Sequence, residues 1–142
     1  MSDAKYVATV SASPDLIWET LTDPVKMKSW ARARKVTIER PGTEAQMGTG
    51  AVRAITTLFG TYREEVTSFD PPRRITYRVI SGLPVRDYEG RMELEPTTSG
   101  TQITWSVTYT PTTVLAPIVP FATKRVQNAI FRRLIRQLQE LG

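Results

Sequence analysis

The chain has 142 residues, 40% of them hydrophobic and 23% charged, which is the composition of one globular domain with its own hydrophobic core. It contains neither cysteine nor histidine. This excludes thiolate nucleophiles, Ser-His-Asp and Cys-His arrangements, and metal sites built on those residues. The formal net charge is +5, but the basic residues are dispersed along the chain, which disfavours a nucleic-acid partner.

The N-terminal part of the chain predicts one strand followed by two short helices. The β-branched run of residues 6–10 is typical of a strand. Ser13-Pro14-Asp15 then provides an N-cap, a proline in the first turn and an acidic residue, which together predict the start of a helix. Asp23-Pro24 repeats this pattern for a second short helix that ends around Trp30.

From Lys35 onward, apolar residues recur at every second position, which predicts β-strands. Turn residues divide this part of the chain at Pro41-Gly42, Gly60, Asp70-Pro71-Pro72, Ser81-Gly82 and Ser99-Gly100. The alternation is clearest in residues 87–95 and 102–109, where one face is apolar and the other polar, so we expect these two strands to form a half-buried hairpin. In total, about six antiparallel strands are predicted after the two helices.

A long C-terminal helix is predicted over about residues 118–141. Its apolar stripe consists of Ala122, Val126, Ile130, Leu134, Leu138 and Leu141, and it is flanked by Phe131 and Ile135. One helix cannot cover a flat sheet of about seven strands. We therefore expect a single α+β domain over residues 1–142, in which a curved antiparallel sheet wraps around the helix and leaves internal space.

Several segments resemble a known family. They are residues 10–18 with 21–23, Gly48-Thr49-Gly50-Ala51-Val52-Arg53, residues 64–73, and residues 100–105. In order and spacing they resemble the START-like (SRPBCC) superfamily, in particular its bacterial polyketide cyclase/dehydrase branch, related to Bet v 1-like proteins. The resemblance implies a helix-grip fold with a cavity beneath the C-terminal helix. It implies no single activity, because this fold hosts lipid carriers, hormone receptors and aromatase/cyclases, and no catalytic residue carries over.

Aromatic residues are the first candidates for the lining of such a cavity. Alternation places four of them on the inner faces of strands, and two more are expected near the mouth. The inner residues are Tyr77, Tyr88, Trp105 and Tyr109, and those near the mouth are Trp30 and Phe59. Their rings would form apolar walls, and their polar ends would hydrogen-bond a ligand. The alternative is that these rings simply pack a closed core.

Arg53 and Glu64 are the most informative charged residues. If Ile55 and Val66 face inward, then Arg53 and Glu64 face inward with them, on strands joined near Gly60. Two inward charges would need each other, because an unpaired buried charge costs several kcal/mol. They would then form a polar anchor or an acid–base pair. The alternative is that a register shift of one residue turns either side chain outward.

Three functions remain open. The first is a protein that carries or sequesters a small apolar molecule of the lipid, polyketide or isoprenoid type. The second is a cyclase, aromatase or dehydratase in which Arg53, Glu64 or a tyrosine moves protons. The third is an accessory protein that acts through its surface. We expect no cofactor or tightly bound metal, no membrane span, a cytoplasmic location, and a monomer or homodimer.

Overall fold

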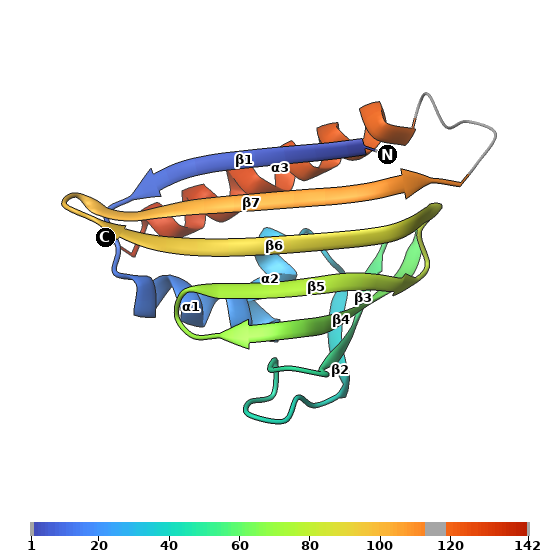
Figure 1. Ribbon diagram of the computed structural model, residues 1–142, viewed down its shortest axis with the longest axis horizontal. Coiled ribbons are helices and arrows are strands. Elements are labelled where there is room, and N and C mark those ends of the chain that lie inside the picture. Colours follow the sequence, from blue (N-terminus) through green and yellow to red (C-terminus); the bar gives the residue numbers. More distant parts are fainter. Residues whose placement is uncertain (1, 113–118, 142) are drawn as a thin grey trace.

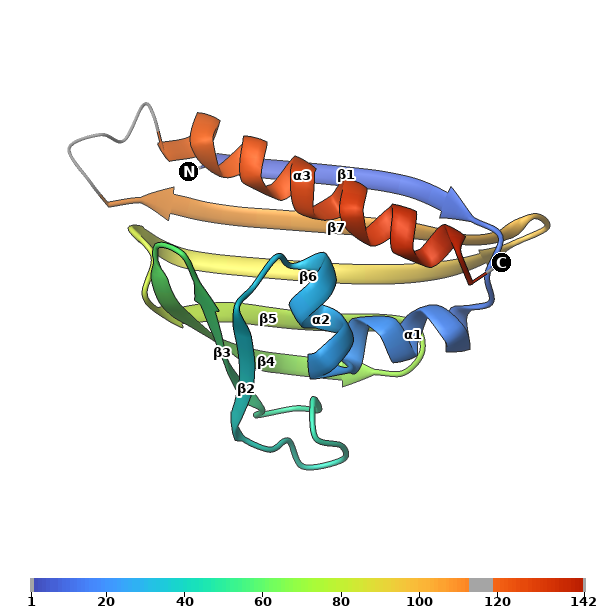
Figure 2. The same ribbon diagram turned by 180° about the vertical axis from the view of Figure 1, so that it is seen from behind.

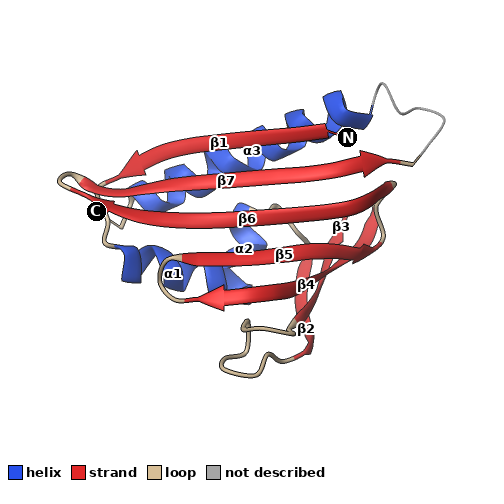
Figure 3. Cartoon of the chain, viewed as in Figure 1, coloured by secondary structure: helices blue, strands red, loops and turns tan. Residues whose placement is uncertain are grey.

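The computed structural model describes residues 2–112 and 119–141. In this part of the chain, seven strands form one antiparallel sheet and three helices lie on a single face of it (Figures 1 and 3). The strands are β1 (Ser2–Val10), β2 (Lys35–Arg40), β3 (Val52–Thr57), β4 (Gly60–Asp70), β5 (Arg74–Ser81), β6 (Val85–Thr97) and β7 (Gly100–Pro111). The helices are α1 (Pro14–Thr22), α2 (Pro24–Trp30) and α3 (Val119–Gln139). None of the described helices combines the length and apolar content needed to span a bilayer.

The strands follow one another in space as they do in the chain, except for the first. The order is β1-β7-β6-β5-β4-β3-β2, so β1 pairs with the last strand and β2 lies at the opposite edge. Helix α3 runs along β1 and β7, while α1 and α2 lie over the part of the sheet formed by β4, β5 and β6 (Figure 2). This is the predicted helix-grip α+β fold, with the long helix against the inner face of the sheet.

The two short helices begin where their capping residues predict. The Ser13 hydroxyl accepts a hydrogen bond from the Leu16 amide at 3.4 Å, and the Asp23 carboxylate accepts one from the Val25 amide at 2.8 Å. Each cap is followed by a proline, whose missing N–H costs nothing in the first turn. Local chemistry alone therefore places both helices directly after β1.

The face of α3 that packs on the sheet differs from the predicted stripe. Leu134 and Leu138 are buried as predicted, but the buried line continues through Phe131 and Gln127. Three members of the predicted stripe are exposed, namely Ala122, Val126 and Leu141. Gln127 can be buried because its Nε2 donates to the Tyr88 hydroxyl at 3.0 Å, which removes the penalty of an unsatisfied amide. Compared with the predicted stripe, the buried face of α3 is thus rotated so that it includes the polar residue Gln127.

Gly90 makes room for the side chain of Tyr77. The two residues are cross-strand partners in β6 and β5, and a Cβ on residue 90 would overlap the tyrosine ring. The absence of a side chain lets the ring of Tyr77 lie over β6, and this sets the position of its hydroxyl group.

We expect Gly90→Ala to lower the free energy of unfolding by roughly 1–3 kcal/mol, because the added methyl group overpacks against the Tyr77 ring. Urea unfolding measures this cost. In a Tyr77→Leu background the same substitution should cost less, because the ring that it overlaps is gone. Equal costs in the two backgrounds would show that Gly90 serves a backbone requirement instead.

Candidate functional site

Arg53 and Glu64 form a buried ion pair between neighbouring strands. They are direct cross-strand partners in β3 and β4, and the Arg53 Nε donates to Glu64 Oε1 at 2.7 Å. The residues are only 5% and 6% exposed. The predicted inward pairing of these two charges is confirmed.

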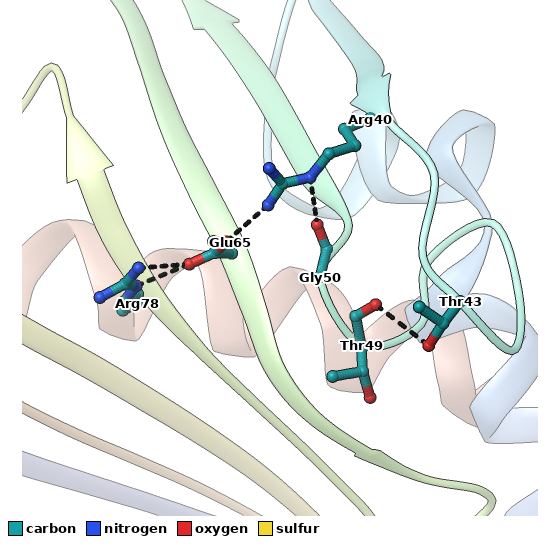
Figure 4. A network of polar contacts seen from close by, with 6 residues as sticks. All are labelled: Arg40, Thr43, Thr49, Gly50, Glu65 and Arg78. Atoms are coloured by element: carbon teal, nitrogen blue, oxygen red, sulfur yellow. Dashed lines mark hydrogen bonds and ion pairs between the residues drawn. The ribbon is translucent and has the colours of Figure 1, made fainter.

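The next residue along β4 lies on the opposite face of the sheet. Glu65 points outward, where Arg40 and Arg78 each pair with its carboxylate at 2.6 Å (Figure 4). The same network reaches the β2–β3 connection, where Arg40 Nε donates to the Gly50 carbonyl at 2.8 Å. Strand alternation therefore sends one of two adjacent carboxylates to the interior and the other to the surface.

The buried pair keeps unused hydrogen-bonding capacity. In the described part of the chain, the pair bond is the only hydrogen bond made by either side chain. Among the described residues, the Tyr109 hydroxyl is the only side-chain polar atom that is both fully enclosed and without a partner. The terminal guanidinium nitrogens of Arg53 and the Oε2 of Glu64 also lack partners, so they are not fully enclosed. They are open to the cavity that both residues line. The Arg53 guanidinium also lies 5.0 Å from the centre of the Tyr77 ring, a cation–π contact.

A cavity lies between the sheet and the helices and has a narrow and a wide part. The narrow part, about 50 Å³, lies beneath α2 and is lined by Leu21, Met27, Trp30, Ala31, Arg53, Tyr62, Glu64, Ile75, Tyr77, Met92, Trp105 and Ile130. The wide part, about 260 Å³, is lined by Tyr62, Glu64, Tyr77, Leu83, Pro84, Val85, Tyr88, Trp105, Ala122, Thr123, Val126, Gln127 and Ile130. Five lining residues are common to both parts, so the two parts adjoin at the level of Glu64.

The wide part reaches the surface between the β5–β6 connection and the first half of α3. Leu83 on one side is 39% exposed, and Val126 on the other is 59% exposed. We call this opening the mouth. Its rim is apolar, whereas the buried ion pair lies where the two parts of the cavity meet.

The tyrosine hydroxyls in the cavity stay protonated, so they can donate hydrogen bonds but do not serve as bases. Burial raises the pKa of Tyr62, Tyr77 and Tyr88 above the ordinary value, and the nearby charge of Glu64 raises it further. Two of the hydroxyls accept hydrogen bonds, that of Tyr77 from Trp105 Nε1 at 2.9 Å and that of Tyr88 from Gln127 Nε2 at 3.0 Å. Tyr62 makes no hydrogen bond among the residues described, so its hydroxyl is available to a ligand.

The structure brings six of the eight predicted site residues to the cavity wall. They are Arg53, Glu64, Tyr77, Tyr88, Trp105 and Trp30, the last beneath α2 rather than at the mouth. Tyr109 lies behind the wall, fully buried, with its ring stacked on Tyr88 at 5.7 Å. Phe59 lies outside the cavity and is 98% exposed. Strand β3 ends at Thr57, so the alternation that was expected to carry Phe59 inward stops two residues earlier.

Sequence reasoning missed three lining residues with polar side chains, namely Tyr62, Thr123 and Gln127. Tyr62 shares the inner face of β4 with Glu64, so the alternation that identified Glu64 could also have found it. Gln127 had no such signal, because a glutamine on a helix surface is ordinarily solvent-facing. Within residues 2–112 and 119–141, no cluster of three or more carboxylates could hold a metal ion.

A model of the family described as polyketide cyclase/dehydrase and lipid transport matches residues 1–141. The chain belongs to this family. The resemblance inferred from its sequence segments is thereby confirmed. No curated protein shows significant sequence similarity to the chain.

Solved structures with low sequence identity share the fold of this family member over nearly the whole chain. The ZhuI aromatase/cyclase from Streptomyces sp. R1128 superposes with a TM-score of 0.80 at 18% identity, covering 97% of this chain and 93% of that one. The protein XoxI from Bacillus cereus gives 0.78 at 19% identity, with coverages of 99% and 98%. The Aha1 dimer from Colwellia psychrerythraea gives 0.75 at 16% identity, with coverages of 100% and 99%.

We expect a double-mutant cycle to reveal strong coupling between Arg53 and Glu64. Arg53→Met or Glu64→Gln alone should each cost about 3–5 kcal/mol of unfolding free energy, because the remaining charge is stranded. The double substitution should cost less than the two losses added together. Denaturant unfolding of the four proteins measures the cycle. Additive effects of a few tenths of a kcal/mol would mean that the pair is solvated like a surface salt bridge.

Proposed function

We propose that the protein binds a small, largely apolar molecule in the cavity and orients it through a polar group held at Arg53 and Glu64. One observation carries this proposal. An apolar cavity with a surface opening ends on a buried ion pair that has hydrogen-bonding atoms to spare. A pocket with apolar walls and a few converging polar groups is the usual form of a small-molecule site.

The dimensions of the cavity favour a compact ligand. The wide part is about 260 Å³, and an apolar cavity of about 150 Å³ is already large enough for benzene. A molecule of one or two rings, or a short branched chain, fits this space. A two-chain membrane lipid does not. Among the lipid, polyketide and isoprenoid types expected from sequence, the volume supports the smaller aromatic and isoprenoid compounds.

The lining determines how such a ligand would lie. Its apolar body would be buried against Trp105 and Ile130, which border both parts of the cavity, at a gain of about 25 cal/mol per Å² of apolar surface. A hydroxyl or carbonyl group would reach the Tyr62 hydroxyl and the free atoms of the ion pair. The ligand would enter through the mouth, between Leu83 and Val126.

We expect 2-naphthol, a two-ring compound with one hydroxyl group, to bind with a Kd below about 100 µM by isothermal titration calorimetry. Ile130→Trp should weaken binding at least about tenfold, because the larger side chain fills the space at the junction of the two parts. Val7→Trp adds the same bulk on β1, where the side chain is 51% exposed, and should leave the Kd unchanged. Unaltered binding by Ile130→Trp would place the ligand outside the cavity.

A second function, proton transfer in a cyclase, aromatase or dehydratase reaction, is supported by one specific observation. Among the described residues that line the two parts of the cavity, Glu64 is the only carboxylate, and its Oε2 makes no hydrogen bond with them. Because the tyrosines there stay protonated, Glu64 would be the base and a tyrosine the hydrogen-bond donor. The fold shared with an aromatase/cyclase is compatible with this chemistry.

Deuterium exchange into 2-tetralone, a two-ring ketone, tests for a base in the cavity. Glu64 Oε2 would take a proton from the carbon beside the carbonyl, and a deuteron from solvent would return to the same carbon. NMR measures the rate of exchange. If the protein accelerates it, we expect Glu64→Gln to lower the rate by about 100-fold. Glu65→Gln, the matched carboxylate on the outer face, should not change it. No acceleration over buffer would leave binding as the function.

A further inference from the structure

The turn between β3 and β4 exposes two large apolar side chains. Thr57 pairs with Gly60, so Leu58 and Phe59 are the two residues of the turn. They are 73% and 98% exposed. The left-handed backbone position of this turn is Gly60, so the turn geometry itself does not require particular side chains at residues 58 and 59. A leucine and a phenylalanine exposed there bury no surface in the fold, and adjacent exposed apolar side chains of this size are typical of an interaction surface.

Unopposed positive charge lies next to this turn. Residues 24–38 contain five cations and no acidic residue, and the cations are Lys26, Lys28, Arg32, Arg34 and Lys35. A groove along the outside of α2 joins three of them to the turn, and it is lined by Val25, Lys28, Ser29, Arg32, Ala33, Arg34 and Leu58. Val25 in this groove is 78% exposed. Apolar and cationic groups therefore form one continuous surface.

These cations differ from those on the outer face of the sheet. There, Arg40 and Arg78 pair with Glu65 (Figure 4), and Arg63 pairs with Glu39. None of the five cations of residues 24–38 forms an ion pair within the described residues. Helix α3 adds Arg133, whose pKa is lowered by burial and by the positive charges of Arg32 and Arg136.

We propose that this α2–hairpin surface, defined by Val25, Lys28, Arg32, Arg34, Leu58 and Phe59, docks on an anionic lipid bilayer. Leu58 and Phe59 enter the boundary between headgroups and acyl chains, and the cations lie against the lipid phosphates. An anionic bilayer contacts both the apolar and the cationic side chains of this surface. Nucleic acid or an acidic protein would engage the cations but leave Leu58 and Val25 in water.

Docking at this place would bring the cavity to the membrane. The opposite side of α2 lines the narrow part of the cavity through Met27, Trp30 and Ala31. The β5–β6 connection at the mouth lies against the start of β4, since Gly82 contacts the backbone of Thr61 and Tyr62. The hairpin turn and the mouth therefore adjoin. The inference does not depend on the proposed function, because bilayer binding is measured without a cavity ligand.

Co-sedimentation with vesicles of phosphatidylcholine containing 30% phosphatidylglycerol tests the proposal on the full chain. We expect binding that weakens between 0.1 and 0.5 M salt and that is absent with pure phosphatidylcholine. Lys28→Gln/Arg34→Gln should lower the partition coefficient by roughly 25-fold, about fivefold per cation. Leu58→Ser/Phe59→Ser should lower it by at least about tenfold. All four side chains are exposed, and circular dichroism checks that the variants fold.

A matched control removes the same charge from the other side of the molecule. Lys5 and Arg91 both lie beside Ser106 in the sheet, on β1 and β6, and both are exposed. Lys5→Gln/Arg91→Gln should leave vesicle binding within about twofold. The proposal is wrong if anionic vesicles do not bind, if the control loses as much as Lys28→Gln/Arg34→Gln, or if a single-stranded oligonucleotide binds where vesicles do not.

Discussion

One long helix has to cover a seven-stranded sheet, and the rest of the structure follows from that constraint. A helix is about 10 Å wide and strands lie about 4.8 Å apart, so α3 covers roughly a third of a flat sheet of this size. Bending the sheet around α3 and adding α1 and α2 over β4, β5 and β6 (Figure 2) encloses most of the remainder. The volume left between the helices and the inner face of the sheet is the cavity. The site therefore exists because the three helices do not fill the space enclosed by the curved sheet.

That leftover volume is what makes the buried ion pair tolerable. Arg53 and Glu64 neutralise each other across β3 and β4 at 2.7 Å, which avoids the cost of a stranded charge. A single hydrogen bond leaves most of the guanidinium unsatisfied, and in a closed core this would be strongly destabilising. Facing a cavity, the same atoms can bind water or the polar group of a ligand. The stability of the pair and its proposed role in binding therefore have one cause.

Helix α2 joins the two surfaces to which we assign a function. Its inner side lines the narrow part of the cavity. Its outer side contributes Val25 and Lys28 to the groove next to the β3–β4 turn, and the segment after it contributes Arg32 and Arg34. On the outer face of the sheet, by contrast, Glu65 and Glu39 neutralise the arginines around them. Among the described residues, the cations of residues 24–38 form no ion pair, and the surface they share with the β3–β4 turn lies next to the mouth of the cavity. A bilayer and a small apolar ligand would meet there.

The sequence by itself predicted the class of fold and both short helices, and it gave the inward Arg53–Glu64 pair as one of two alternatives. These depend on local chemistry, namely capping residues, period-two alternation and a tight turn that sets the register of its own hairpin. The burial of Gln127 and the exposure of Val126 were decided only by the tertiary structure. Periodicity tells which side of an element is apolar, but the rotation of α3 over the sheet depends on partners distant in the chain. Gln127 became interior because Tyr88, 39 residues away, supplies its hydrogen bond.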